Sequence, residues 1–178
     1  MGYYFLQKRE PLNNAIKVPA LWDFCEKLYA EPDIELLCLH LQDEQNVNVL
    51  ILLWCTWLEV RGEKLTAGKF AMASGRITAA SESAVVPLRE ARRLMKVQKP
   101  LPPAVMAEVR DHILRAELLA EKCLLLELET LNTGDKIDFP ECDTLLPLDR
   151  LIADTHLQDS EVWLSTLRAA ANRVTSPA

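Results

Sequence analysis

An almost entirely apolar segment at residues 47–58, Val-Asn-Val-Leu-Ile-Leu-Leu-Trp-Cys-Thr-Trp-Leu, constrains the fold of this chain more than any other part. A helix that is apolar on every side has to be buried, so the segment predicts a helix at the centre of the molecule. It is about half as long as a bilayer-spanning helix, which requires about 20 residues. A soluble protein with no membrane segment is therefore expected.

The composition favours helices throughout the chain. Apolar residues make up 49% of the 178 residues and only five are glycine, which allows a substantial core. Alternating runs of Val, Ile and Thr, which are typical of strands, are scarce. We expect an all-α, single-domain helical bundle of six to eight helices with one long helix at about 104–132.

Three regions are expected along the chain. Residues 1–18 are expected to form a flexible arm, 19–132 the helical core, and 133–178 a loop with C-terminal helices that pack on that core. Inside the core, Pro87 lacks a backbone N–H and is expected to break the helical region at 66–97.

Charge and cysteine content limit the function classes. The formal net charge of −6 argues against a surface that binds nucleic acid generally, because phosphate binding requires concentrated positive charge. The N-terminus lacks the features of a signal peptide. Buried, reduced thiols in a cytoplasmic protein are expected for the five cysteines, since none of them has CxxC spacing and the first four lie in apolar, helical surroundings. They are Cys25, Cys38, Cys55, Cys123 and Cys142.

The first candidate site for a ligand or partner borders the apolar segment. An acid and several amides within seven residues could bind a cation, a polar ligand or a partner's backbone. In the alternative interpretation the asparagines turn the chain and cap the next helix, and the acid pairs with an arginine. The tryptophans are expected to anchor the core rather than stack on a ligand. The residues of this candidate site are Trp22, Gln42, Asp43, Asn46, Asn48 and Trp54.

The second candidate site is a basic helix face. Arg89, Arg92, Arg93 and Lys96 recur at spacings of i, i+3, i+4 and i+7, which places four cations on one side of a helix. This face could bind the phosphates of RNA. It could also form salt bridges with the acidic side of the long helix, and we favour this interpretation because the chain is acidic overall. The acidic residues are Glu108, Asp111, Glu117, Glu121, Glu127 and Glu129.

The long helix carries more apolar surface than one helix face needs. From residue 118 to residue 131 its leucines extend beyond a single stripe. The economical explanation is that C-terminal helices at about 148–155 and 159–173 cover this surface. The alternative is a second protomer, which would make the protein a homodimer through 104–132.

The sequence carries no signature of metal or nucleophilic chemistry. Paired Glu-x-x-His motifs, HExxH, zinc-finger spacing and GxSxG are all missing from it. No metal and no cofactor are expected. The enzyme question stays open, with the residues favouring a non-catalytic protein.

Several short patterns together resemble a family of small bacterial proteins known only as a domain of unknown function. The resemblance covers roughly residues 19–130 and implies a bacterial, cytoplasmic, all-helical protein. It implies no activity, cofactor or catalytic residue. The patterns are Leu21-Trp22-Asp23-Phe24, Leu41-Gln42-Asp43, Val47-Asn48-Val49-Leu50, Leu53-Trp54-Cys55, Trp57-Leu58, Val85-Val86-Pro87-Leu88-Arg89 and Ala91-Arg92-Arg93.

Three functional hypotheses follow from the sequence. The leading one is a non-catalytic interaction or adaptor protein with an unknown protein partner. The second is a small-molecule-binding protein or enzyme with a pocket near Gln42, Asp43 and Asn48. The third is association with RNA or the ribosome through the basic helix face, which the net charge disfavours.

Overall fold

A computed structural model describes residues 20–98, 102–133, 143–155, 157 and 160–175. The predicted arm at 1–18 and Cys142 lie outside these residues. The elements in chain order are α1 (Ala20–Tyr29), α2 (Ile34–Gln45), α3 (Val49–Val60), β1 (Leu65–Thr66), α4 (Ala67–Gln98), α5 (Pro103–Thr133), β2 (Thr144–Leu145), α6 (Pro147–Thr155) and α7 (Ser160–Thr175). The predicted all-α class is confirmed, with seven helices in the described part of the chain.

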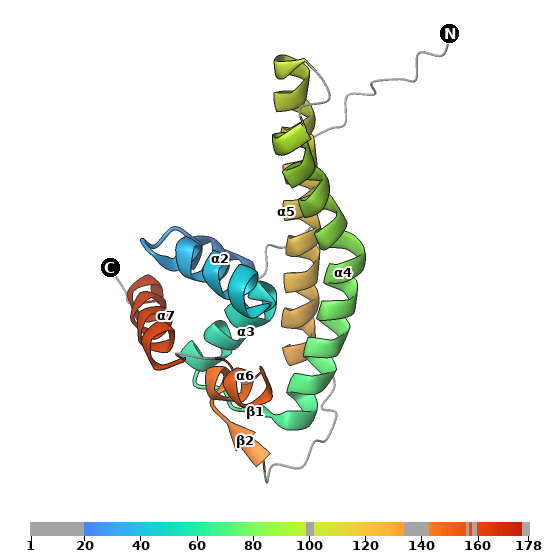
Figure 1. Cartoon of the computed structure of the whole chain (residues 1–178). Coiled ribbons are helices and arrows are strands. Elements are labelled where there is room, and N and C mark those ends of the chain that lie inside the picture. Colours follow the sequence, from blue (N-terminus) through green and yellow to red (C-terminus); the bar gives the residue numbers. More distant parts are fainter. Residues whose placement is uncertain (1–19, 99–101, 134–142, 156, 158–159, 176–178) are drawn as a thin grey trace.

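Two long helices, α4 and α5, lie side by side as a hairpin whose connecting end projects away from the shorter helices (Figure 1). The predicted break at Pro87 is wrong, because α4 continues through this residue for 32 residues in all. An interior proline removes one helical hydrogen bond and costs about 3 kcal/mol in isolation. Here Pro87 is exposed, so water can bind the freed carbonyl, while neighbouring Val85 is buried and anchors the helix.

The centre of the molecule is α3, as the apolar segment predicts. Every residue from Leu50 to Leu58 is buried, and α1, α5, α6 and α7 all pack against this helix. Trp54 is fully buried. The predicted role of this tryptophan as a core anchor is confirmed.

The turn between α2 and α3 uses both asparagines. Asn46 ends α2 in the left-handed conformation, with φ 55°. Asn48 precedes α3, and its Oδ1 accepts a hydrogen bond of 3.0 Å from the backbone N–H of Leu50. Such a cap satisfies one of the free N–H groups at a helix start. Val47 between them is buried and fixes the turn to the core.

The C-terminal helices pack mainly against α3 and not over the long helix, so the expected covering of α5 is wrong. A carboxylate on α3 explains this placement. Glu59 accepts a hydrogen bond of 3.3 Å from the backbone N–H of Leu148 at the start of α6. Its other oxygen accepts one of 2.5 Å from Nε of Arg168 on α7. The helices α1, α3 and α4 instead pack against α5, where Leu124, Leu125 and Leu128 are buried, while Leu118 and Leu119 stay exposed.

A two-residue antiparallel pairing joins β1 to β2, with Leu65 opposite Leu145 and Thr66 opposite Thr144. The pairing fixes the start of α4 beside the start of α6. It has no signal in the sequence, because two residues are too few to show the alternation of a strand. Within the described ranges, no helix combines the length and the apolar character needed to cross a bilayer.

Candidate functional site

The two sets of polar residues singled out in the sequence meet in one network, and Arg89 on α4 lies at its centre. Its Nη1 donates a hydrogen bond of 2.6 Å to Oε1 of Gln42 on α2. Its Nη2 donates one of 2.8 Å to Glu121, and its Nε donates one of 3.0 Å to Glu117, both on α5. One guanidinium therefore links α2 to both helices of the hairpin.

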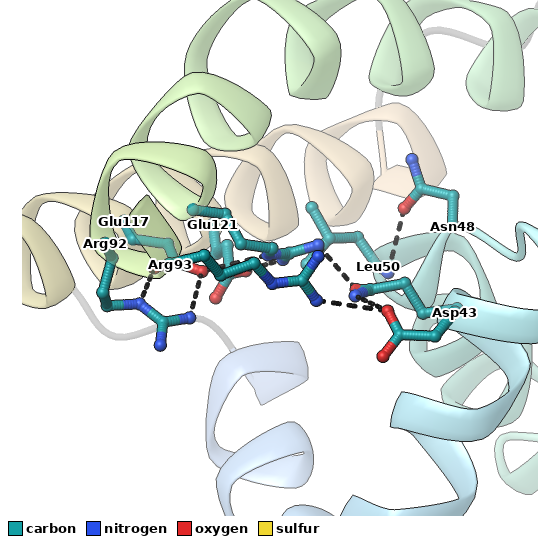
Figure 2. Close-up of polar contacts among 9 residues, drawn as sticks. Asp43, Asn48, Leu50, Arg92, Arg93, Glu117 and Glu121 are labelled. Carbon is teal, nitrogen blue, oxygen red and sulfur yellow. Dashed lines mark hydrogen bonds and ion pairs between the residues drawn. The ribbon is translucent and has the colours of Figure 1, made fainter. Parts of the chain in front are cut away.

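Glu117 is the buried carboxylate of this network, with 4% of its surface exposed. Arg92 binds both of its oxygens, through Nε at 2.7 Å and Nη2 at 3.2 Å (Figure 2). Burial acts to raise the pKa of Glu117, but hydrogen bonds from Arg92 and Arg89 outweigh it and lower the pKa below its ordinary value. Glu117 is therefore held as a charged, fully paired group.

Glu121 is less well compensated. Burial raises its pKa above the ordinary value, and the charge of Arg89 offsets this effect only in part. Arg89 divides its donors between two carboxylates, whereas Glu117 also has Arg92 to itself. The network is thus short of positive charge at Glu121.

A fourth ion pair extends the network to the surface. Nη2 of Arg93 lies 3.2 Å from Oδ1 of Asp43, and both side chains are about half exposed. Nε2 of Gln42 donates to the same oxygen at 3.4 Å. These hydrogen bonds from Gln42 and Arg93 lower the pKa of Asp43. An exposed pair of this kind contributes little stability.

The basic helix face is therefore salt-bridged rather than free. The expected pairing with the long helix is confirmed for Arg89 and Arg92, and Arg93 instead pairs with α2. Lys96 is exposed and has no ion pair with any residue that the structure describes. A phosphate ligand would have to displace carboxylates that the arginines already bind.

The two tryptophans of the candidate set differ in their surroundings. Trp54 is fully buried on α3, where it offers no surface to a ligand. Trp22 on α1 is half-buried, and Nζ of Lys122 lies 4.7 Å from its ring centroid. This is a cation–π distance, so the cation covers part of the Trp22 ring.

Beside the network is a groove with a cavity volume of about 970 Å³, lined by α1, α2, the start of α3, the α4–α5 hairpin, and two residues of α6. Trp22, Gln42, Asn46 and Asn48 line it, while Asp43 and Trp54 do not. Three leucines that also line it are substantially exposed. They are Leu39 at 40%, Leu114 at 38% and Leu118 at 45%.

The network lies within the range matched by the model of one protein family, residues 20–128, and so does the groove apart from Leu151 and Thr155. The chain belongs to this family. It is described as "Protein of unknown function (DUF2390)". The resemblance to an uncharacterised family is confirmed in this form. No curated protein and no solved structure matches the chain.

The DUF2390 region contains the whole Arg89 network, since α2, α4 and the paired carboxylates of α5 lie inside it, and α6 and α7 lie outside. Among the residues that the structure describes, no group of three His, Cys, Asp or Glu side chains could hold a metal ion. The groove of this DUF2390 chain presents apolar side chains beside amides and carboxylates.

Two groove residues were not singled out in the sequence. Leu39 and Leu114 look like ordinary members of apolar helix faces, and no local pattern marks them as exposed. Their exposure depends on how far α2 stands from the hairpin, which is a tertiary quantity. A single sequence holds no signal for it.

Proposed function

We propose that this chain is a non-catalytic interaction protein that binds a protein partner in the groove between α2 and the α4–α5 hairpin. The observation that carries the proposal is the exposure of Leu39, Leu114 and Leu118 along one cavity. Apolar side chains gathered in a groove and rimmed by polar residues are typical of interaction sites.

The paired state of the charged residues supports binding over catalysis. A general acid or base needs a pKa near the working pH and a proton that is free to move. Glu117 is held charged by two arginines, and Glu121 is tied to Arg89. The network therefore serves as a rigid base for the groove and presents a fixed shape to a partner.

A second candidate function uses the same groove. Its volume of about 970 Å³ falls in the range of sites for small molecules, about 300–1,000 Å³. The amides of Gln42, Asn46 and Asn48 would supply polar contacts to such a ligand. RNA association receives no comparable support, since Arg89 and Arg92 are bound to carboxylates.

Two neighbouring leucines on α5 allow a matched test. Leu118 lines the groove, whereas Leu119 is similarly exposed but does not line it. Tagged wild type, Leu118→Arg and Leu119→Arg would be purified from the native host after crosslinking in cells. The proposal expects a protein partner that is retained by wild type and Leu119→Arg and lost from Leu118→Arg. Equal recovery with all three proteins contradicts it.

Solution mass separates a second copy of the chain from another partner. The predicted homodimer through α5 would give a mass of two chains in light scattering, and Leu118→Arg or Leu119→Arg would reduce it to one. A mass of one chain for the wild type argues for a partner of different sequence. Ligand retained after native mass spectrometry, with no protein partner, would favour the small-molecule function.

A further inference from the structure

We infer that the partner segment received by this groove is a basic amphipathic helix. The inference rests on the proposed function and names the chemistry of its partner. Three features support it: the apolar stripes that border the groove, the carboxylates there that form no ion pair with a described residue, and the helical backbone of the groove walls.

The α5 wall of the groove is a single helical stripe. Leu114, Leu118 and Glu121 lie at spacings of i, i+4 and i+7, which places them on one side of α5. Both leucines are more than one third exposed. The wall is thus apolar along its length and acidic at one end.

The α2 wall is a second helical stripe, with one leucine between two polar residues. Glu35, Leu39 and Gln42 repeat the i, i+4 and i+7 spacing, and all three line the groove. Leu39 is exposed between a carboxylate and an amide. Two walls that each present exposed leucine beside polar residues suit an occupant that is apolar on one side and polar on its flanks.

The charge that remains free in the groove is negative. Glu26, Glu35 and Glu82 line it, are exposed, and have no ion pair with any described residue. The arginines of the groove are all engaged by carboxylates of the chain, as described above. An occupant with Lys or Arg side chains would be attracted, whereas an acidic segment or a phosphate chain would be repelled.

Glu121 adds a specific site for one of these cations. It shares Arg89 with Glu117 and is the carboxylate that the network compensates least. Burial raises the pKa of Tyr29, and Glu121 and Glu35 both add to this effect, so the two carboxylates lie near the same hydroxyl. A lysine or arginine of the partner placed here would supply the missing charge.

The walls also favour a helical occupant over an extended one. An added strand needs a sheet edge with free backbone groups. The lining residues of the groove come from the helices α1 to α6 and from the turns that follow α1 and α2, and none of them belongs to β1 or β2. The backbone groups in the interior of these helices bond within each helix. Recognition therefore depends on side chains, which an amphipathic helix presents at i, i+3, i+4 and i+7.

Two labelled model peptides of about 14 residues provide the probes. Both carry Leu on one helical face, one has Lys and the other has Glu on the opposite face, and binding is measured by fluorescence anisotropy with the whole chain. The Lys peptide should bind at least about tenfold more tightly than the Glu peptide, and this preference should decrease with salt. Equal binding of the two peptides overturns the inference.

Matched variants test whether the Lys peptide binds in the groove and whether a groove carboxylate attracts it. Leu118→Arg should weaken binding of the Lys peptide about tenfold or more, while Leu119→Arg, with the same change of charge outside the groove, should leave it unchanged. Glu35→Gln should weaken it about threefold, in line with a partly exposed ion pair, and Glu44→Gln on the same helix should not. Identical effects of the paired variants would show unspecific attraction and overturn the inference.

These outcomes separate the inference from the proposed function. If Leu118→Arg abolishes capture of the cellular partner but the Lys peptide binds no better than the Glu peptide, the groove binds a partner of other chemistry and only the inference fails. If Leu118→Arg captures the cellular partner as well as wild type does, the proposed function fails, whichever peptide binds more tightly. A wild-type mass of two chains that depends on Leu118 identifies a second copy as the occupant and overturns the inference.

Discussion

Nη1 of Arg89 lies 2.6 Å from Oε1 of Gln42, 47 positions earlier in the chain. This bond joins α2 to a guanidinium whose other two donors hold Glu117 and Glu121 on α5. A side chain that satisfies partners on two separate helices fixes their relative position. The groove beside it keeps its width because this contact is made.

Glu117 is expected to be the most sensitive charged position of the network. Glu117→Gln removes the charge that two arginines share while nearly preserving the side-chain volume. Removing one partner of a buried ion pair costs about 3–5 kcal/mol. Because Arg89 and Arg92 are 22% and 29% exposed and can be partly hydrated, we expect the free energy of unfolding to fall by about 2 kcal/mol. Urea unfolding of wild type and Glu117→Gln measures this loss.

Asp111→Asn provides the control for this prediction. Asp111 and Arg115 form an exposed i, i+4 pair on the same helix, with 2.7 Å between the charged atoms. The same acid-to-amide change should cost only about 0.3–0.5 kcal/mol there. Equal losses for the two variants would mean that burial of Glu117 has no energetic consequence, contrary to the structure.

The two network carboxylates should have opposite effects on the pH dependence of stability. The raised pKa of Glu121 means that this group favours folding most below its ordinary value of 4.5, and that this contribution is lost as the pH rises through the folded pKa. Glu121→Gln should therefore gain stability relative to wild type as the pH rises above about 4.5. Urea unfolding at several pH values measures the difference.

Glu117 should change the pH dependence of stability in the opposite direction. Its lowered pKa means that its contribution is complete above the ordinary value of 4.5 and is lost as the pH falls through the folded pKa. The difference in the free energy of unfolding between wild type and Glu117→Gln should therefore become smaller in acid. If the free energy of unfolding changed with pH in the same way for wild type and both variants, the pKa directions given for Glu117 and Glu121 would be contradicted.

Arg89→Lys tests whether the guanidinium positions α2. A lysine keeps the charge but has one compact ammonium group, which cannot donate to Gln42, Glu117 and Glu121 in the same geometry. Amide hydrogen exchange of α2 should become faster, with exchange in α7 little changed. Arg93→Lys is the matched control, because Arg93 makes a single exposed pair with Asp43 and should tolerate lysine.

The cap of the central helix can be tested independently of the network. Asn48→Ala removes the acceptor for the backbone N–H of Leu50 and should lower the free energy of unfolding by about 1 kcal/mol. Asn48→Asp keeps an acceptor and adds a negative charge, which a helix N-terminus favours, so it should match or exceed wild type. A loss with aspartate equal to that with alanine would contradict the capping role.

Periodicity predicted most of the fold because helices leave a regular signal. The burial of α3 follows from a segment with no polar side, and Asn48 as a cap follows from its place before that segment. The prediction of a helix break at Pro87 is wrong because packing along the whole hairpin offsets the cost of an interior proline. Local rules describe that cost and not the tertiary contacts that oppose it.

The candidate site was predictable in its parts and not in its assembly. Gln42 and Arg89 each stood out from their neighbours in sequence, and the acidic side of the long helix was a foreseeable partner for the basic face. Their convergence depends on where α2 meets the hairpin, which is set by contacts of α1 and α3 far from either residue. The exposed leucines of the groove depend on the same geometry.

Thiol reactivity gives a direct test of the core. Cys25, Cys38 and Cys55 are buried, and burial raises all three thiol pKa values, that of Cys38 to about 12. Cys123 is exposed on α5, so the expectation of a buried thiol is wrong at this position. Iodoacetamide should therefore modify Cys123 in the native protein and the other three only after unfolding in guanidinium, since the thiolate is the reactive species. Peptide mass spectrometry measures the sites. Modification of Cys55 in the native protein at the rate of Cys123 would place α3 outside the core and contradict the fold.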